Sequence, residues 1–139
     1  MLLLIILFPL VGAIFNGLVG RYLPKGLVTL VAVGSVAVSF VLAVLSFIEL
    51  YGISHDAEHA ALVYHYYEWF SIKIPGGTVV PINVQFTMDS LSGVMTLVVT
   101  GVGGLIHMYS VGYMGEDEGY PRFMSFLNLF MASMLILVL

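Results

Sequence analysis

The sequence contains no cysteine and few charged residues. Without thiols the chain cannot form disulfide bonds, bind a metal through thiolates or hold an iron–sulfur cluster on cysteines of its own. Only 9 % of its 139 residues are charged, whereas soluble domains have about 25 %. The net charge is −4 and no basic run is present. Nucleic-acid binding is therefore excluded as a function class, because phosphates are neutralised by Lys and Arg.

The residues that are present are mostly apolar. Hydrophobic residues make up 60 % of the chain, and the mean hydropathy is +1.09. A soluble fold of this size would lack the polar residues needed to cover its surface. We therefore predict an all-α membrane protein that lies in a lipid bilayer, with about four transmembrane helices and a β-hairpin in a long extracytoplasmic loop between the second and third.

The predicted spans divide the chain into three sections: 1–50 with two helices, 51–87 as the loop, and 88–139 with two more helices. The first apolar segment has no positively charged start and no cleavage site, so we interpret it as a retained helix rather than a signal peptide. Asn16 and Asn128 lie inside apolar spans, where hydrogen bonds to other helices are expected. The four predicted spans are Leu2–Val19, Leu27–Leu50, Leu91–Met108 and Phe123–Leu139.

The loop section contains two runs rich in aromatic and β-branched residues, Tyr64–Ile74 and Thr78–Phe86. They flank Pro75-Gly76-Gly77, and this order predicts a β-hairpin. Its aromatic side chains suit the membrane interface. His55 and His59 would lie one helical turn apart, but no further ligand follows at a convincing spacing, so we reject a metal site there.

A polar stripe is expected along the third span. Asp89 precedes it in the sequence Asp-Ser-Leu-Ser, which provides helix N-cap chemistry. At about 100° of rotation per residue, a helix over this span places small and polar residues together on one face. A helix–helix packing seam and a hydrated track are both compatible with it. The stripe consists of Asp89, Ser92, Gly93, Thr96, Thr100, Gly103, Gly104 and His107.

His107 is the best candidate for a functional residue, because a histidine at the end of a polar stripe could relay protons. The alternative is a histidine at the membrane interface that bonds to the polar loop predicted over Met108–Arg122. Asp89 lies 18 positions away, roughly 27 Å at about 1.5 Å per residue, too far for direct proton exchange. No nucleophile–base pair, phosphate-binding loop or metal motif indicates an enzyme site in this chain.

Orientation is predicted from the cations. Arg21, Lys25 and Arg122 fall on the side of the first and third loops, and Lys73 falls on the other. The positive-inside rule then puts the loop Met108–Arg122 in the cytoplasm and both chain ends outside it.

The stretch from His107 to Met134, with its sequence HMYSVGYMGEDEGYPRFMSFLNLFMASM, resembles the antiporter-like membrane subunits of respiratory complex I. The family pattern is H-x-Y-S-x-G-Y-M, an acidic residue, Y-x-R-F and L-N-L-F-x-x-S-M. Asp89–Met95 resembles the family's D-x-L-S-x-x-M entry to its third helix, and Phe8–Ala13 with Asn16-Gly17-Leu18 resembles its first helix.

The resemblance implies a multi-pass subunit of the inner (plasma) membrane that translocates protons and carries no redox site. It would be a subunit of the NADH:quinone oxidoreductase enzyme, partnered by other membrane-arm subunits. FMN, Fe–S clusters, NADH and quinone would bind elsewhere in that complex, and this chain would bind no cofactor or metal.

The family's proton path uses a glutamate and lysines on later helices than this chain reaches, so we expect an N-terminal scaffold with no catalytic residue. His107, Asp89 and Arg122 remain as motif matches, with either proton-path or structural roles. The large subunit of a multi-subunit Na⁺/H⁺ antiporter, the membrane subunit of an energy-converting hydrogenase and a scaffold without transport remain as alternatives.

Overall fold

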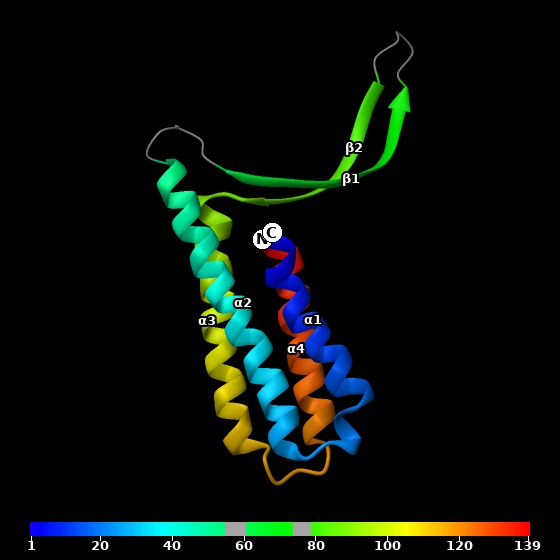
Figure 1. Ribbon diagram of the computed structural model, residues 1–139, viewed down its shortest axis with the longest axis vertical. Helices are drawn as coiled ribbons and strands as arrows, with labels where there is room; N and C mark the ends of the chain where they lie inside the picture. Colours follow the sequence, from blue (N-terminus) through cyan, green and yellow to red (C-terminus); the bar gives the residue numbers. More distant parts are fainter. Residues whose placement is uncertain (55–60, 74–78) are drawn as a thin grey trace.

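A computed structural model describes residues 1–54, 61–73 and 79–139. It consists of helices and one two-stranded antiparallel hairpin, which confirms the predicted kinds of element. His55, His59 and the Pro-Gly-Gly turn lie outside the described residues. The elements shown in Figure 1 are, in chain order, α1 (Leu2–Leu18), the short 3-10 turn η1 (Gly20–Tyr22), α2 (Lys25–Ser54), β1 (Leu62–Lys73), β2 (Val79–Met88), α3 (Ser90–Tyr113) and α4 (Tyr120–Val138).

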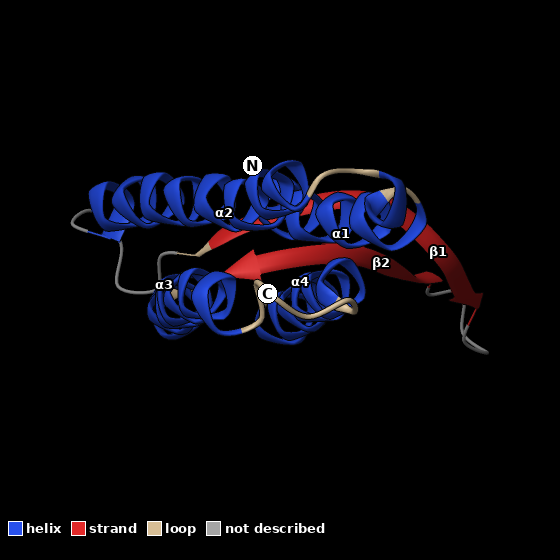
Figure 2. Cartoon of the chain, turned by 90° about the horizontal axis from the view of Figure 1, so that it is seen from below, coloured by secondary structure: helices blue, strands red, loops and turns tan. Residues whose placement is uncertain are grey.

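The four α-helices form one bundle. α1 packs against α2 and α4, and α3 packs against α2 and α4. Seen end-on, α1 and α2 form one layer while α3 and α4 form the other (Figure 2). α2, α3 and α4 are long and apolar enough to cross a membrane, and α1 is a shorter apolar helix of 17 residues. α2 has 30 residues, about 45 Å at about 1.5 Å per residue, so it is longer than a hydrocarbon core of about 30 Å.

The loop predicted over Met108–Arg122 is wrong in its length. α3 continues through Tyr113 and α4 already begins at Tyr120, so the connection is the short segment 114–119. Tyr109 and Tyr113 are four residues apart on α3, and their rings stack with centroids 5.8 Å apart. Such a pair supports another helical turn. α3 ends at its C-cap Met114. Gly115 follows it at a position where a Cβ would lie 2.8 Å from the Val111 carbonyl oxygen.

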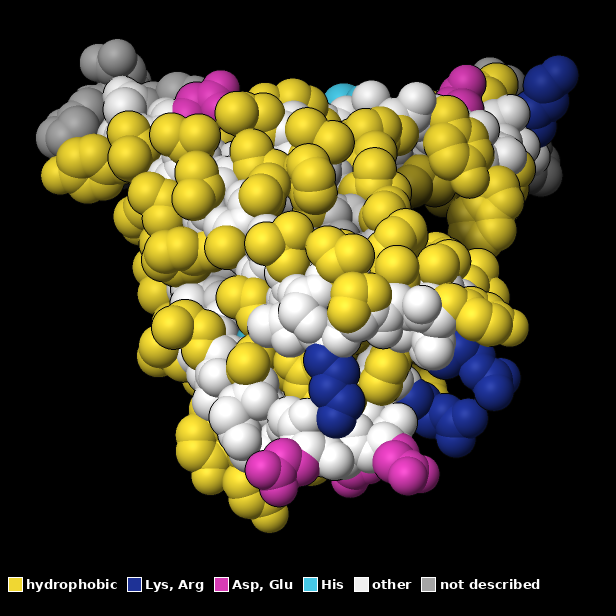
Figure 3. Space-filling model, turned by 60° about the horizontal axis from the view of Figure 1, so that its bottom comes forward, with side chains coloured by type: hydrophobic (Ala, Val, Ile, Leu, Met, Phe, Trp, Pro, Cys, Tyr) yellow, Lys and Arg dark blue, Asp and Glu magenta, His cyan; other side chains and the backbone are white. Residues whose placement is uncertain are grey.

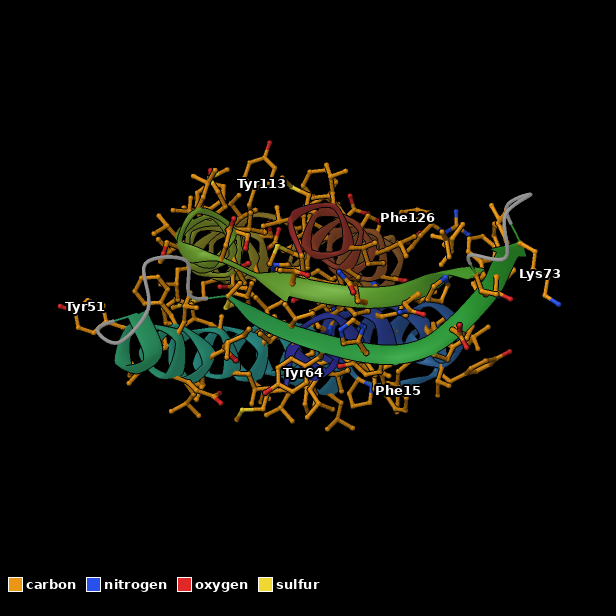
Figure 4. The ribbon with its side chains drawn as sticks, turned by 90° about the horizontal axis from the view of Figure 1, so that it is seen from above. Phe15, Tyr51, Tyr64, Lys73, Tyr113 and Phe126 are labelled. Carbon is orange, nitrogen blue, oxygen red and sulfur yellow. The ribbon has the colours of Figure 1, made fainter. Side chains whose placement is uncertain are left out.

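The hairpin lies across one end of the bundle and extends beyond it (Figures 1 and 4). Its register shifts twice, so that Tyr66 and Trp69 have no partner on β2. Such β-bulges bend a strand and increase its twist. The backbone N–H of Leu3 donates to the Tyr66 hydroxyl at 3.3 Å, and the N–H of Thr87 donates to the Leu139 carbonyl at 3.1 Å. These bonds join the hairpin to the ends of α1 and α4.

Two apolar clusters fill the bundle. The cluster at the hairpin end includes Ile5, Ala43 and Leu135, together with Leu62 and Met88 from the strands. The cluster at the opposite end consists of Val28, Ala32, Tyr120 and Met124. Between the two clusters, α2, α3 and α4 each contribute a polar side chain: Ser35, His107 and Asn128.

Candidate functional site

Ser35, His107 and Asn128 form the central polar group of the bundle. The ring Nε2 of His107 lies 2.7 Å from Asn128 Oδ1, and the ring Nδ1 lies 2.7 Å from the Gly103 carbonyl oxygen one turn earlier. The Asn128 Nδ2 also donates to the Ser35 hydroxyl at 3.3 Å. Both His107 and Asn128 are completely buried. The expected cross-helix bond of Asn128 is therefore confirmed, and it joins α4 to both α3 and α2.

This pattern restricts the protonation of His107. A carbonyl oxygen can only accept, so Nδ1 donates to Gly103 and carries a hydrogen. With Asn128 Oδ1 facing Nε2, the second ring nitrogen must also donate, which requires a charged ring. A half-turn of the Asn128 amide instead lets its NH₂ group donate to Nε2 of a neutral ring. Oδ1 then faces the Ser35 hydroxyl, whose one hydrogen can go either to Oδ1 or to the Ala32 carbonyl.

Two glycines allow the helices to approach at this level. A Cβ on Gly12 of α1 would lie 2.6 Å from Ser35 Oγ and 2.7 Å from Asn128 Nδ2. A Cβ on Gly103 of α3 would overlap the Met131 sulfur. Small residues let membrane helices pack closely. The stripe on α3 is thus a packing seam: Gly93, Thr96, Thr100, Gly103 and His107 are buried.

Further hydrogen bonds connect other helix pairs. The Asn16 Nδ2 donates to the Val28 carbonyl at 3.2 Å, which confirms the cross-helix bond predicted for Asn16. The Ser125 hydroxyl donates to the Ala13 carbonyl at 2.6 Å, joining α4 to α1. The Tyr120 hydroxyl lies 2.5 Å from the Thr29 hydroxyl, joining α4 to α2. These polar side chains therefore hold the bundle together at several levels.

Asp89 forms the predicted N-cap of α3. Its carboxylate accepts the Ser92 backbone N–H at 2.7 Å, and the Asp89 N–H donates to the Ser92 hydroxyl at 2.9 Å. The bond from the Ser92 N–H, followed by that from its hydroxyl, holds the pKa of Asp89 below its ordinary value of 3.8. The reciprocal pair satisfies the otherwise free N–H groups at the start of the helix. Asp89 thus has a structural role in capping α3.

The three candidate residues do not form one site. Asp89 lies at the hairpin end of α3, whereas the exposed Arg122 lies in the first turn of α4 at the opposite end of the bundle. His107 is buried between them and its partner is Asn128, so the interpretation of His107 as an interfacial residue bonded to the loop is wrong. Among the described residues, no group of three His, Asp or Glu side chains could hold a metal ion.

An apolar cavity of about 240 Å³ lies beside His107, between α3 and α4. Apart from the histidine, its lining residues are glycine, valine, isoleucine, leucine, phenylalanine and methionine. None of these side chains can accept or donate a strong hydrogen bond. The cavity therefore provides no chain of polar side chains along which a proton could reach the ring.

Comparison with known proteins finds one matching family model and a set of similar chains. Residues 74–124 match the family model described as NADH-Ubiquinone oxidoreductase (complex I), chain 5 N-terminus. NADH-quinone oxidoreductase subunit L of Neisseria meningitidis serogroup B is 37 % identical over 138 residues, which is 99 % of this chain. The same subunit of Rickettsia conorii is 36 % identical over 97 % of the chain. NADH-ubiquinone oxidoreductase chain 5 of Triticum aestivum is 34 % identical over 99 %.

Nearly the whole chain is thus similar to one part of complex I subunit L and chain 5 proteins. It spans 19 % of the length of each of these three relatives. The family model covers Asp89, His107 and Arg122 but ends before Asn128, and Ser35 lies outside it as well. The longer matches to the subunit L relatives extend over 97–99 % of the chain.

Sequence reasoning missed the contact between Asn128 and His107, and Ser35 was not among its candidate residues. The available signal is that each of three apolar helices contains polar side chains, because polar side chains in hydrocarbon form hydrogen bonds across helices. Each helix contains several of them, so the signal does not select the partners. The Thr29–Tyr120 bond was missed because Tyr120 was assigned to the loop rather than to the first turn of α4.

Proposed function

We propose that the chain forms the first part of a proton-translocating, antiporter-like membrane subunit of complex I. The observation that carries this proposal is similarity to subunit L relatives over 97–99 % of the chain rather than over one motif. The whole protein would lie in the inner membrane and contact other membrane-arm subunits. NADH, FMN, Fe–S clusters and quinone would bind to other subunits, and this chain would contribute no cofactor ligand.

Within that subunit, residues 1–139 act as a scaffold in which His107 is a positioning residue. Both ring nitrogens of His107 are within hydrogen-bond distance of protein groups. The adjoining cavity is apolar, so a relayed proton would have no acceptor on that side. These features favour a role in holding α3 against α4. Asp89 caps α3, and Arg122 adds a positive charge at the end of the bundle where the segment 114–119 connects α3 to α4.

The proposed orientation places the segment 114–119 in the cytoplasm and both ends of residues 1–139 outside it. Three of the four Lys and Arg residues lie at the loop end of the bundle, which agrees with the positive-inside rule. The hairpin then lies on the extracytoplasmic side. Its exposed Tyr66, Tyr67, Trp69 and Phe70 would lie at the membrane interface, where amphipathic aromatic rings accumulate.

The proposal is tested on the complete protein in its native membrane. An affinity tag on the complete protein should retrieve NADH-oxidising, quinone-reducing activity together with the other membrane subunits. The purified complex, placed in liposomes, should generate a pH difference across the liposome membrane when NADH and quinone are supplied. Retrieval of a Na⁺/H⁺ antiporter or a hydrogenase without NADH oxidation would contradict the assignment. A stable protein with no transporting partner would favour the scaffold alternative.

A further inference from the structure

A polar cavity lies at the loop end of the bundle, where η1, α2 and α4 meet. Its volume is about 760 Å³, and it is separate from the central polar group. Arg21, Lys25 and Arg122 line it, together with a single acid, Glu118. Figure 3 shows the Lys and Arg side chains on this end of the molecule, beside the acidic residues of the loop. The lining therefore carries a net positive charge of two, three cations less one acid.

The cations of the cavity, Arg21, Lys25 and Arg122, form no ion pair with any carboxylate in the part of the chain that the structure describes. Lys25 donates to the Gly115 carbonyl at 2.7 Å, and the Arg21 guanidinium lies 5.8 Å from the centre of the Tyr22 ring. Arg122 lies in the first turn of α4, where the Tyr120 N–H already donates to the Asp117 carbonyl and Pro121 has no N–H. Two guanidinium groups thus border one space, and each favours an anion.

A buried side chain provides an independent sign of a ligand. Asn16 lines the cavity and is 1 % exposed, but its Oδ1 has no hydrogen-bond partner. Its Nδ2 donates to the Val28 carbonyl, which can only accept, so the amide orientation is fixed with Oδ1 as the free acceptor. A buried acceptor without a donor costs free energy. A ligand that offers a hydroxyl or ammonium hydrogen next to its anionic group would satisfy it.

The cavity also borders apolar surface. Phe126 of α4 is part of its lining and is 62 % exposed, and Leu18 at the end of α1 is 71 % exposed. In a membrane these side chains would face acyl chains, while the cations would lie at the level of the headgroups. Anionic lipids attract basic groups at this depth, and basic pockets between membrane helices bind their headgroups.

From this geometry we infer that the cavity binds the headgroup of an anionic phospholipid that carries a free hydroxyl, with its phosphodiester on Arg21 and Arg122. The hydroxyl donates to Asn16 Oδ1, and the acyl chains run along the apolar faces of α1 and α4. The inference needs these helices to lie in a membrane, but it does not depend on proton translocation. The pumping assay and a lipid-binding assay can therefore fail independently.

The test uses the complete protein, purified in its complex and exchanged into mild detergent. Fluorescent phosphatidylglycerol is titrated and the dissociation constant is measured, with phosphatidylcholine as the neutral lipid. Arg21→Gln and Arg122→Gln should each weaken phosphatidylglycerol binding about fivefold, the equivalent of about 1 kcal/mol for one cation near a membrane surface. Arg→Lys at either position should keep most of the affinity because it keeps the charge.

Lys73→Gln is the matched control, since Lys73 is a lone cation at the far end of β1 (Figure 4). It should leave binding unchanged. The inference is overturned if Lys73→Gln weakens binding as much as the arginine variants, or if none of the variants does. It is also overturned if inorganic phosphate displaces the lipid at equal concentration, because the cavity would then be a general anion site. Size-exclusion chromatography of each variant checks that the complex has assembled.

Discussion

Replacing Asn128 by Leu tests whether the central polar group holds the bundle together. The change removes the amide that lies between the His107 ring and the Ser35 hydroxyl. Two hydrogen bonds are lost, each worth about 0.6 kcal/mol on average between membrane helices. A ring nitrogen of His107 also stays buried without a partner, at a cost of about 1 kcal/mol or more. We expect the free energy of unfolding to fall by about 2 kcal/mol.

The assay is unfolding of the complete protein by a denaturing detergent titrated into a mild one, followed as a double-mutant cycle with His107→Phe. The His107–Asn128 contact is short and completely buried, so we expect its coupling energy in the upper part of the range for membrane helices, about 1 kcal/mol. Leu129→Ala, on the exposed side of α4, is the control and should not couple to His107. A coupling energy below about 0.3 kcal/mol, as for independent sites, would refute the proposed contact.

The same variants separate a positioning role of His107 from a relay. If His107 positions α3, proton pumping by His107→Phe should fall only in proportion to the amount of assembled complex. Met108→Ala is a useful comparison, because Met108 is the next residue but is 63 % exposed. Loss of pumping from a fully assembled His107→Phe complex of normal stability would show that the ring itself carries protons.

Three further predictions follow from single sites. Gly103→Ala should lower the free energy of unfolding by about 1–3 kcal/mol, because the new Cβ overlaps Met131. Gly112→Ala on the same helix is the control: its Cβ meets nothing within 4 Å, so the change should be neutral or stabilising. Both variants are measured by the same detergent titration. Asp89→Ala should cost about 1 kcal/mol as a lost N-cap and speed hydrogen exchange of the Ser92 amide. Because the folded pKa of Asp89 is lowered, its ionised form stabilises the protein above the unfolded pKa, and this stability should be lost as pH falls through the folded pKa, with no such loss in Asp89→Ala. The orientation is tested in a cysteine-free background of the complete protein with a thiol reagent that does not cross membranes. Glu116→Cys should react only from the cytoplasmic side, and Ser71→Cys only from the extracytoplasmic side. The reverse pattern would contradict the proposed orientation.

Local features could be predicted from the sequence because their causes are local. The Asp89–Ser92 cap depends on residues three positions apart, and the order of apolar runs around a Pro-Gly-Gly turn was enough to predict the hairpin. The end of α3 was placed too early because the polar side chains between Met108 and Tyr113 suggested a loop. Exposed tyrosines are compatible with a helix that leaves the hydrocarbon, so polarity alone did not indicate where α3 stops.

The candidate site depends on which helices pack together, and the sequence carries little of that information. Asn128 was correctly predicted to bond across helices, but its partner could not be chosen without the arrangement of α3 and α4. The two bulges at Tyr66 and Trp69 were also beyond prediction. Strand composition indicates pairing, whereas the residue excluded from the ladder depends on how the strand bends over the bundle.

The distribution of hydrogen bonds gives His107 a specific place in this bundle. Side-chain bonds join α1 to α2, α1 to α4 and α2 to α4. Among hydrogen bonds between described residues, the His107–Asn128 contact is the one side-chain bond from α3 to another helix. The seam between α2 and α3 contains Ser46 and Thr96, whose buried hydroxyls have no partner, and Phe40 packs against Gly101 there. Lipid provides no hydrophobic drive for helix association, so helices are held by packing and by hydrogen bonds between them. Loss of His107 should therefore loosen α3 from α4, while the packed seam between α2 and α3 stays intact.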